Sequence, residues 1–148
     1  MNTEIRLLES HEAAVLDHVA RGVFDKAVDR QLTAEFFADA RHHLAVAIED
    51  GVVVGMASAV HYVHPDKPPQ LFINEVGVAP THQGRRFGRQ LVELLVKLAT
   101  DLGCTEAWVL TDSSNVVAQR LYEGAGGETP PDSCIMYTIR IVPAAVVD

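Results

Sequence analysis

The sequence predicts a mixed α/β (α+β) domain built on one central sheet, and three observations carry this prediction. The order of the expected elements places an antiparallel hairpin ahead of a strand–helix–strand–helix half. The dipeptide Asp50-Gly51 separates two β-rich runs, and both positions of such a two-residue turn need positive φ. The stretch from Leu71 to Leu102 joins an apolar strand to a long helix with leucines at helical spacing. We therefore expect the strands before and after that helix to be parallel neighbours.

The N-terminal half is expected to supply one strand, two helices and the hairpin. Ser10 and Thr33 are candidate N-caps of the two helices, because a hydroxyl oxygen can accept a free N–H at a helix start. The proline-rich loop from His64 to Gln70 ends the hairpin, since proline cannot donate to a sheet ladder. In chain order the expected elements are Glu4–Leu8, His11–Val23, the helix after Thr33, Leu44–Glu49 and Val52–His64.

The C-terminal half is expected to alternate strands and helices. Its first strand is almost continuously apolar, which indicates burial on both faces, and Gly77 within it suggests a bulge or a close backbone approach. The helix that follows carries its leucines on one stripe and ends at Gly103. In chain order the expected elements are Leu71–Val78, the helix to Leu102, Glu106–Thr111, Asn115–Ala125 and a closing strand at Cys134–Val142.

Size and charge narrow the range of functions. The 148 residues favour a single domain over residues 1–148, and 48 % hydrophobic residues suffice for a real core. The formal net charge of −8 disfavours a nucleic-acid partner and favours a cationic small molecule or a basic peptide. The acidity could equally serve only to keep the protein soluble, and charge alone does not decide between these alternatives.

Cysteine usage and the N-terminus indicate the compartment. Cys104 and Cys134 are far apart and form no C-x-x-C pair, which is typical of a reduced intracellular protein. The first residues are charged and lack the apolar core of a signal peptide. No apolar run approaches the roughly 20 residues that span a bilayer. We therefore expect a cytoplasmic protein with no membrane partner.

The junction between the Leu71 strand and the leucine-striped helix is the strongest candidate for a binding site. It holds two glycines and three arginines in a chain that is otherwise acidic. Backbone N–H groups at the positive end of a helix attract phosphate, glycine allows close approach, and arginine adds charge. We therefore predict a seat for the pyrophosphate of a nucleotide-containing cofactor. The alternative role of Arg85, Arg86 and Arg89 is a solvated helix face.

The same junction resembles the pyrophosphate motif of the GCN5-related N-acetyltransferase (GNAT) superfamily. That motif is Gln/Arg-x-x-Gly-x-Gly/Ala at the start of the central helix, and here V-A-P-T-H-Q-G-R-R-F-G runs from Val78 to Gly88 with Gln83 in the first position. Arg86 stands where the middle glycine is expected. Because a helical φ is negative, we expect its Cβ to be accommodated.

A second signature of the superfamily is an asparagine followed by a helix with a Leu-Tyr pair and a glycine-rich end. It is matched by Asn115, by Leu121-Tyr122 and by the glycines after them. The resemblance covers nearly the whole chain and implies a single domain with helices on both sheet faces and a splayed pair of parallel strands. A looser similarity over Tyr62–Val78 is to the aminoglycoside 3-N-acetyltransferases.

The resemblance implies an acetyltransferase that uses acetyl-CoA as co-substrate and needs no metal. The acetyl group would pass directly to a primary amine of a small cationic acceptor, such as a polyamine or an aminoglycoside-like sugar. The implied catalytic residues are Glu75, Tyr122 and Val78. The implied CoA-binding residues are Val76, Gly77, Val78, Gln83, Gly84, Arg85, Arg86, Phe87, Gly88, Arg89, Asn115 and Tyr122.

Each catalytic residue has an alternative role. Strand alternation places Glu75 on the face of Leu71 and Ile73, where it could act as general base, hold the ammonium by charge, or form a buried salt bridge. Tyr122 could protonate the leaving thiolate or simply pack. The Val78 N–H would donate to the oxyanion. Asn115, assigned to the pantetheine arm, could also be a helix N-cap.

The histidines and Cys134 are not expected to form a reactive site. His42-His43 and His61-x-x-His64 make no convincing metal-binding set, because positions three apart on a strand face opposite sides. His82 is expected to be a solvent-facing loop residue, and Cys134 a strand residue with no adjacent base.

The acceptor would lie between the first helices, at about residues 24–43, and the loop at Glu128–Ser133. Four acidic residues give that side an acidic character: Asp25, Asp29, Glu35 and Asp39. An ordinary solvated helix face is the equal alternative. The rival functions are a protein N-terminal or lysine acetyltransferase, and a CoA-binding sensor without catalysis. A P-loop hydrolase is excluded because no G-K-[ST] follows a glycine loop. A homodimer stays open beside a monomer.

Overall fold

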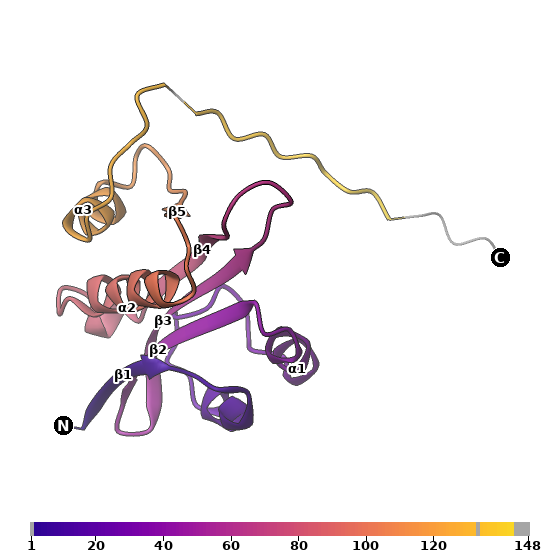
Figure 1. Cartoon of the computed structure of the whole chain (residues 1–148). Coiled ribbons are helices and arrows are strands. Elements are labelled where there is room, and N and C mark those ends of the chain that lie inside the picture. Colours follow the sequence, from indigo (N-terminus) through magenta and orange to yellow (C-terminus); the bar gives the residue numbers. More distant parts are fainter. Residues whose placement is uncertain (1, 133, 144–148) are drawn as a thin grey trace.

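The computed structural model describes residues 2–132 and 134–143, and helices lie against both faces of a five-stranded sheet (Figure 1). The strand order is β1-β2-β3-β4-β5, antiparallel up to β4 and parallel between β4 and β5. The mixed fold and its parallel pair are thus confirmed. The elements are β1 (Thr3–Leu7), the 3-10 helix η1 (Ser10–Asp17), α1 (Arg30–Ala38), β2 (His42–Glu49), β3 (Val52–Tyr62), β4 (Gln70–Val78), the 3-10 helix η2 (Pro80–His82), α2 (Phe87–Asp101), β5 (Ala107–Val109) and α3 (Val116–Gly124).

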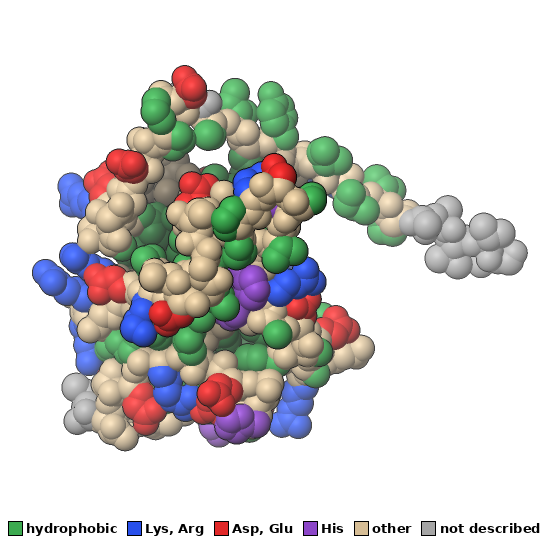
Figure 2. All heavy atoms as spheres, viewed as in Figure 1, with side chains coloured by type: hydrophobic (Ala, Val, Ile, Leu, Met, Phe, Trp, Pro, Cys, Tyr) green, Lys and Arg blue, Asp and Glu red, His purple; other side chains and the backbone are tan. Residues whose placement is uncertain are grey.

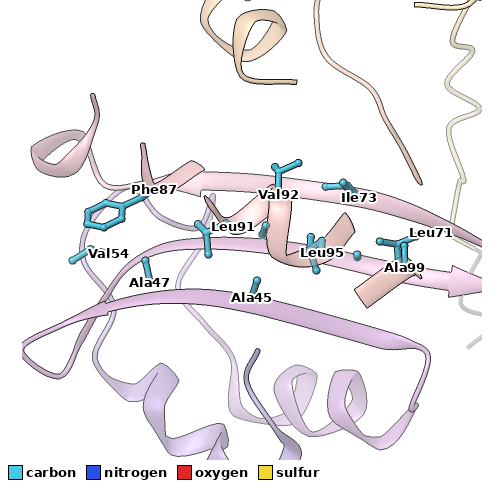
Figure 3. Packing of buried hydrophobic residues seen from close by; sticks show 12 residues of the cluster. Ala45, Ala47, Val54, Leu71, Ile73, Phe87, Leu91, Val92, Leu95 and Ala99 are labelled. Atoms are coloured by element: carbon cyan, nitrogen blue, oxygen red, sulfur yellow. The ribbon is translucent and has the colours of Figure 1, made fainter. Parts of the chain in front are cut away.

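Each face of the sheet has its own core. On one face Leu91 and Leu95 of α2 are fully buried against strand residues such as Ala45 (Figure 3). On the other face Leu16 of η1 packs with Met56 of β3, and α1 adds its phenylalanines. Among the described residues, none of the helices has both the length and the apolar character needed to cross a bilayer.

The local turn signals are confirmed. Asp50 and Gly51 both have positive φ, 51° and 80°, as a two-residue hairpin turn requires. Gly103 follows α2 with φ 78°, a conformation that glycine adopts without the steric cost of a Cβ. The strand predicted at Glu106–Thr111 shortens to Ala107–Val109, because only these residues pair with β4.

The helix predicted at His11–Val23 ends at Asp17. Beyond that point the chain pairs with β3: the Val53 N–H donates to the His18 carbonyl and the Ala20 N–H donates to the Val53 carbonyl, both at 2.8 Å. The prediction was wrong because these tertiary hydrogen bonds replace those that would have continued the helix.

Both predicted N-caps are displaced by an acidic residue. Ser10 is the first residue of η1, and Glu9 precedes it as the cap. Thr33 lies inside α1, whose cap is Asp29; the Asp29 Oδ1 accepts the Leu32 N–H at 2.8 Å. The Asp29 carboxylate satisfies a free N–H and complements the helix dipole, whereas at η1 the Glu12 carboxylate accepts the Glu9 N–H at 3.1 Å.

The predicted closing strand is not formed. Residues 134–143 belong to no strand or helix, and the segment runs away from the body of the molecule (Figure 1). The alternating apolar sequence is suited to a strand, but a strand exists only where a second strand completes its hydrogen bonds, and no described residue does so here.

Two histidines meet across β2 and β3. His43 Nε2 lies 2.8 Å from His61 Nδ1, and the rings are stacked. Half-burial lowers the pKa of His43 from 6.5 to about 4, with smaller contributions from His61 and His42. The native state therefore binds fewer protons than the unfolded chain between these two pH values.

We expect the protein to lose stability as the pH falls from 6.5 towards 4. The stabilisation is fully present above pH 6.5, because His43 is then neutral in both states, and it is lost as the unfolded chain becomes protonated first. Allowing for partial exposure, the loss at pH 5 is about 1 kcal/mol, or about 4 °C in Tm. Differential scanning calorimetry should show a smaller decline for His43→Gln, whereas the control His64→Gln, at a histidine outside the strands, should decline as the native protein does.

Candidate functional site

A gap between β4 and β5 is the first feature of the candidate site. The two parallel strands pair over three residues only, at Ala107–Val109 of β5. Beyond this point β4 keeps its pairing with β3, where the Ala79 N–H donates to the Val54 carbonyl at 2.8 Å. Because N–H groups alternate along a strand, those of Val76 and Val78 face the gap. The predicted splay is present, and no strand of the described residues pairs with β4 on the side of these two donors.

A run of free backbone N–H groups adjoins the gap. No acceptor among residues 2–132 and 134–143 takes the N–H groups of residues 83–89, and the Gln90 N–H is the first to find one, the Arg86 carbonyl at 3.1 Å. A Cβ added at Gly84 would meet no atom within 4 Å, so the space there is open. This arrangement at the positive end of α2 favours an anion.

Arg86 has a backbone conformation that the sequence did not indicate. It precedes α2 with φ 64°, in the left-handed region, so the expectation of a negative helical φ was wrong. A side chain in this region costs about 1–2 kcal/mol, which glycine avoids. Arg85 and Arg89 each have a carboxylate partner, whereas the guanidinium of Arg86 has none among the described residues.

We expect Arg86→Gly to raise the free energy of unfolding by about 1 kcal/mol, because glycine removes the left-handed strain. The matched variant Arg86→Ala keeps the Cβ and should gain nothing, so urea melts of the two variants isolate the backbone effect. We expect Arg86→Gly to bind CoA as tightly as the native protein or more tightly in calorimetry. A rise in Kd of about tenfold in both variants would instead identify the Arg86 side chain as a ligand.

Glu49, at the end of β2, holds the loop between β4 and α2 through two side-chain contacts. Its carboxylate oxygens lie 3.1 Å from His82 Nε2 and 3.0 Å from Arg85 Nη2, and these contacts, His82 first, lower the pKa of Glu49. Arg85 also lies over the Phe87 ring, 5.0 Å from its centroid. His82 is therefore not the solvent-facing residue that was predicted. Sequence reasoning missed Glu49 because it is far from the loop along the chain.

Two residues at the start of α2, Arg89 and Gly88, contact other parts of the protein. Arg89 Nε donates to Glu93 Oε1 at 2.7 Å. A Cβ at Gly88 would lie 2.6 Å from Leu121 Cδ1, so this glycine admits α3 against α2. Gly88 was predicted to let a phosphate approach, and its packing role follows only from the tertiary structure.

Glu75 lies on the opposite sheet face from the one predicted. Ser58 of β3 pairs with Glu75, but the next residue of β3 pairs with Ile73, so Asn74 is an extra residue in β4. A one-residue bulge inverts the side-chain alternation beyond it. Val76 then joins Ile73 against the α2 core, and Glu75 lies on the face that η1 and α1 cover.

The Glu75 carboxylate is exposed, and among the described residues it forms no ion pair or side-chain hydrogen bond. The alternative of a buried salt bridge is therefore wrong. A hollow of about 140 Å³ opens at the adjacent Asn74, lined also by Phe36 and His42. A free carboxylate beside a hollow can hold a cation or accept a proton.

Gly77 must be a glycine because the backbone of the N-terminal half passes very close to it. A Cβ at Gly77 would fall well inside 3.0 Å of the Val23 carbonyl oxygen, a separation that real Cβ atoms do not show. The close backbone approach allowed for in the sequence is thus present at Gly77, and the bulge lies at Asn74 instead. This contact holds the loop before α1 against the end of β4.

Tyr122 and Asn115 lie on α3 and at its start. Tyr122 is half-buried beside the α2 core, and burial raises the pKa of its hydroxyl, so it stays protonated at neutral pH. The Asn115 Oδ1 accepts the Ala118 N–H at 3.0 Å, which confirms the N-cap.

The groove on the N-terminal side does not have the acidic character that was predicted. It measures about 930 Å³ between η1, the following loop and α1. Of the four acidic residues expected there, only Asp25 lines the groove: Glu35 is outside its lining, Asp29 caps α1, and Asp39 is bound by Arg41. The other charged lining residues are Asp17, Arg21, Lys26 and Arg30.

Comparison with known proteins gives consistent results. A family model described as "Acetyltransferase (GNAT) family" matches residues 11–126. Aminoglycoside N(6')-acetyltransferase type 1 of Salmonella typhimurium is 32 % identical over 92 residues, 58 % of this chain and 63 % of that protein. Mycothiol acetyltransferase of Stackebrandtia nassauensis is 31 % identical over 125 residues, 83 % of this chain and 40 % of that protein. The chain thus spans less than two thirds of the length of these curated relatives.

Solved structures show the same fold. An aminoglycoside N-acetyltransferase solved in complex with CoA matches with a TM-score of 0.72 and 24 % identity, over 95 % of this chain and 96 % of that chain. The aminoglycoside enzyme from Salmonella is of the N(6') type, whereas the looser similarity in the sequence was to the 3-N type.

Proposed function

Because this chain belongs to the GNAT acetyltransferase family, we propose that it moves an acetyl group from acetyl-CoA to a primary amine of a small cationic acceptor. The observation that carries the proposal is the run of free N–H groups from residue 83 to residue 89, next to the gap in the sheet. An anion seat and an adjoining strand edge are the two things a pyrophosphate and its pantetheine arm require.

The CoA would bind along this path. Its pyrophosphate accepts hydrogen bonds from the backbone N–H groups between Gln83 and Arg89. Among the arginines of this stretch, Arg86 is the one that has no carboxylate partner among the described residues. The pantetheine arm enters the gap and pairs with the open N–H groups of Val76 and Val78. The thioester oxygen then lies at the Val78 N–H, which stabilises the oxyanion of the tetrahedral intermediate.

The transfer itself is a single displacement. The acceptor arrives as an ammonium and gives a proton to Glu75, directly or through water. The amine nitrogen attacks the thioester carbon and the C–N bond forms. The nitrogen then gives its second proton to water, and the C–S bond breaks. The CoA thiolate takes a proton from Tyr122, and Tyr122 regains a proton from bulk water. The products are the amide, free CoA thiol and one proton.

We expect Tyr122→Phe to lower kcat about tenfold, because phenylalanine cannot deliver a proton to the thiolate. KM for acetyl-CoA should change little, since the ring and its packing are retained. Steady-state kinetics with a thiol-release assay measure both values. A variant with native kcat would leave Tyr122 with a packing role only.

Two observations support an aminoglycoside-like or polyamine acceptor. A curated relative carries the name aminoglycoside N(6')-acetyltransferase. The Glu75 carboxylate is exposed and has no partner among the described residues, so a cationic amine can reach it. The mixed charges of the N-terminal groove do not add to this argument.

The test is a thiol-release assay with acetyl-CoA and a panel of amines. Turnover with aminoglycosides or polyamines is the expected result. Turnover with peptides alone would favour a protein N-terminal or lysine acetyltransferase. CoA binding without turnover on any amine would favour a non-catalytic sensor, and no heat of CoA binding in calorimetry would remove the proposal.

A further inference from the structure

Glu49 links the end of β2 to the loop before α2, although 11 % of its side chain is all that solvent reaches. One carboxylate oxygen lies 3.1 Å from His82 Nε2. The other accepts hydrogen bonds from Arg85 Nη2 at 3.0 Å and from the Thr3 hydroxyl at 3.4 Å. The contacts with His82 and Arg85 lower the pKa of Glu49, so the group stays ionised at neutral pH and its hydrogen bonds are charge-assisted.

The two loop partners of this carboxylate stand on either side of the turn where the free N–H groups begin. His82 precedes the turn, and Arg85 lies within it. Gly84 and Arg86 have positive φ, 80° and 64°, and the N–H groups of residues 83–86 have no acceptor among the described residues. These N–H groups therefore do not fix the shape of the turn. Side-chain contacts must do so, and the carboxylate supplies two of them from a distant strand.

The charge of Glu49 by itself would work against an anion at this place. A carboxylate near the seat repels a phosphate, and it also holds Arg85, which could otherwise pair with that phosphate. Basic side chains project from the end of the molecule where α2 begins, on the left of the view (Figure 2). Charge alone therefore predicts tighter anion binding when Glu49 is neutralised, whereas a positioning role predicts weaker binding. The two effects have opposite signs.

We propose that Glu49 is a positioning residue for CoA: through His82 and Arg85 it holds the backbone N–H groups of residues 83–89 in the arrangement that receives the pyrophosphate. This role rests on the proposed function, since it concerns the same anion seat. Donors that are already in place bind more tightly, because the loop loses no further freedom when the ligand arrives. Positioning outweighs charge here, because repulsion at an exposed seat is screened by salt, whereas a loose loop weakens every donor at once.

The first test compares two carboxylates that each hold an arginine beside the seat. Glu49→Gln keeps the size of the side chain and removes its charge, and calorimetry should show the Kd for CoA rising about tenfold. The matched control is Glu93→Gln, because Glu93 Oε1 accepts from Arg89 Nε at 2.7 Å within α2. Both variants remove one negative charge and free one arginine, but only the first breaks a link between the loop and the sheet. The control should bind CoA at least as tightly as the native protein.

The outcomes separate this role from the proposed function. An unchanged or lower Kd for Glu49→Gln, or an equal rise in both variants, would overturn the positioning role while CoA binding by the native protein still supports acetyl transfer. Absence of CoA binding by the native protein would remove both proposals together.

The second test distinguishes positioning from a general loss of structure. Acetyl-pantetheine carries the same thioester as acetyl-CoA but lacks the pyrophosphate. With the best amine of the panel, Glu49→Gln should show a KM for acetyl-CoA about tenfold higher and a kcat within about twofold of the native value. Its kcat/KM for acetyl-pantetheine should stay within about twofold of that of the native protein. Equal losses with both donors would show that Glu49 only supports the fold.

Discussion

Glu75→Gln is expected to lower kcat by at least about 100-fold and to leave the Kd for CoA within about twofold. The amide keeps the size of the side chain but cannot accept the ammonium proton. Glu75 is exposed beside the bulge at Asn74, on the face away from α2, and carries no ion pair among the described residues. Its loss should therefore affect chemistry and not the fold. A thiol-release assay measures kcat, and calorimetry with CoA measures the Kd.

The control for this prediction is Glu106→Gln, which removes another exposed carboxylate, just before β5, where it accepts a hydrogen bond from Gln70. Its kcat should stay within about twofold of the native value. A Glu75→Gln variant with native kcat but a raised KM for the amine would show that Glu75 holds the acceptor by charge only. Unchanged kcat and KM would remove Glu75 from the mechanism.

Gly77→Ala is expected to lower the free energy of unfolding by about 3 kcal/mol, or about 10 °C in Tm. The added Cβ would fall well inside 3.0 Å of the Val23 carbonyl oxygen, a backbone atom that cannot move without displacing its loop. That loop also pairs with β3 through Val53, so the strain would spread into the sheet.

The matched control is Gly124→Ala at the end of α3. Its Cβ would meet only the flexible end of the Arg89 side chain, at 3.3 Å, and alanine favours a helix over glycine by about 1 kcal/mol. Thermal and urea melts should show the control to be neutral or more stable. If Gly77→Ala melts like its control, the close approach of Val23 to β4 is not maintained in solution.

Short-range signals predicted much of the fold. The Asp50-Gly51 turn, the leucine stripe of α2 and the Asn115 cap each depend on residues within one turn or one helix, so the sequence pattern contains the whole physical cause. The same is true of the open N–H groups before α2, which follow from a glycine-bearing junction at a helix start.

Other features depended on partners that lie far away in the chain. The predicted sheet face of Glu75 was wrong because a one-residue bulge in β4 inverts it. The register between β3 and β4 is set by both strands together. The first helix ended early because the Val53 N–H donates to the His18 carbonyl and the Val53 carbonyl accepts the Ala20 N–H. Glu49 was missed because nothing near it in sequence indicates the loop it holds.

The sequence by itself determined the fold class, the order of the main elements, the family and the junction before α2 that carries the open N–H groups, because each depends on hydrogen-bonding and packing patterns that repeat within a few residues. Only the tertiary structure decided the left-handed conformation of Arg86, the exposed face of Glu75 and the unpaired state of residues 134–143. These depend on which distant backbone groups meet, and a one-dimensional pattern does not contain that information.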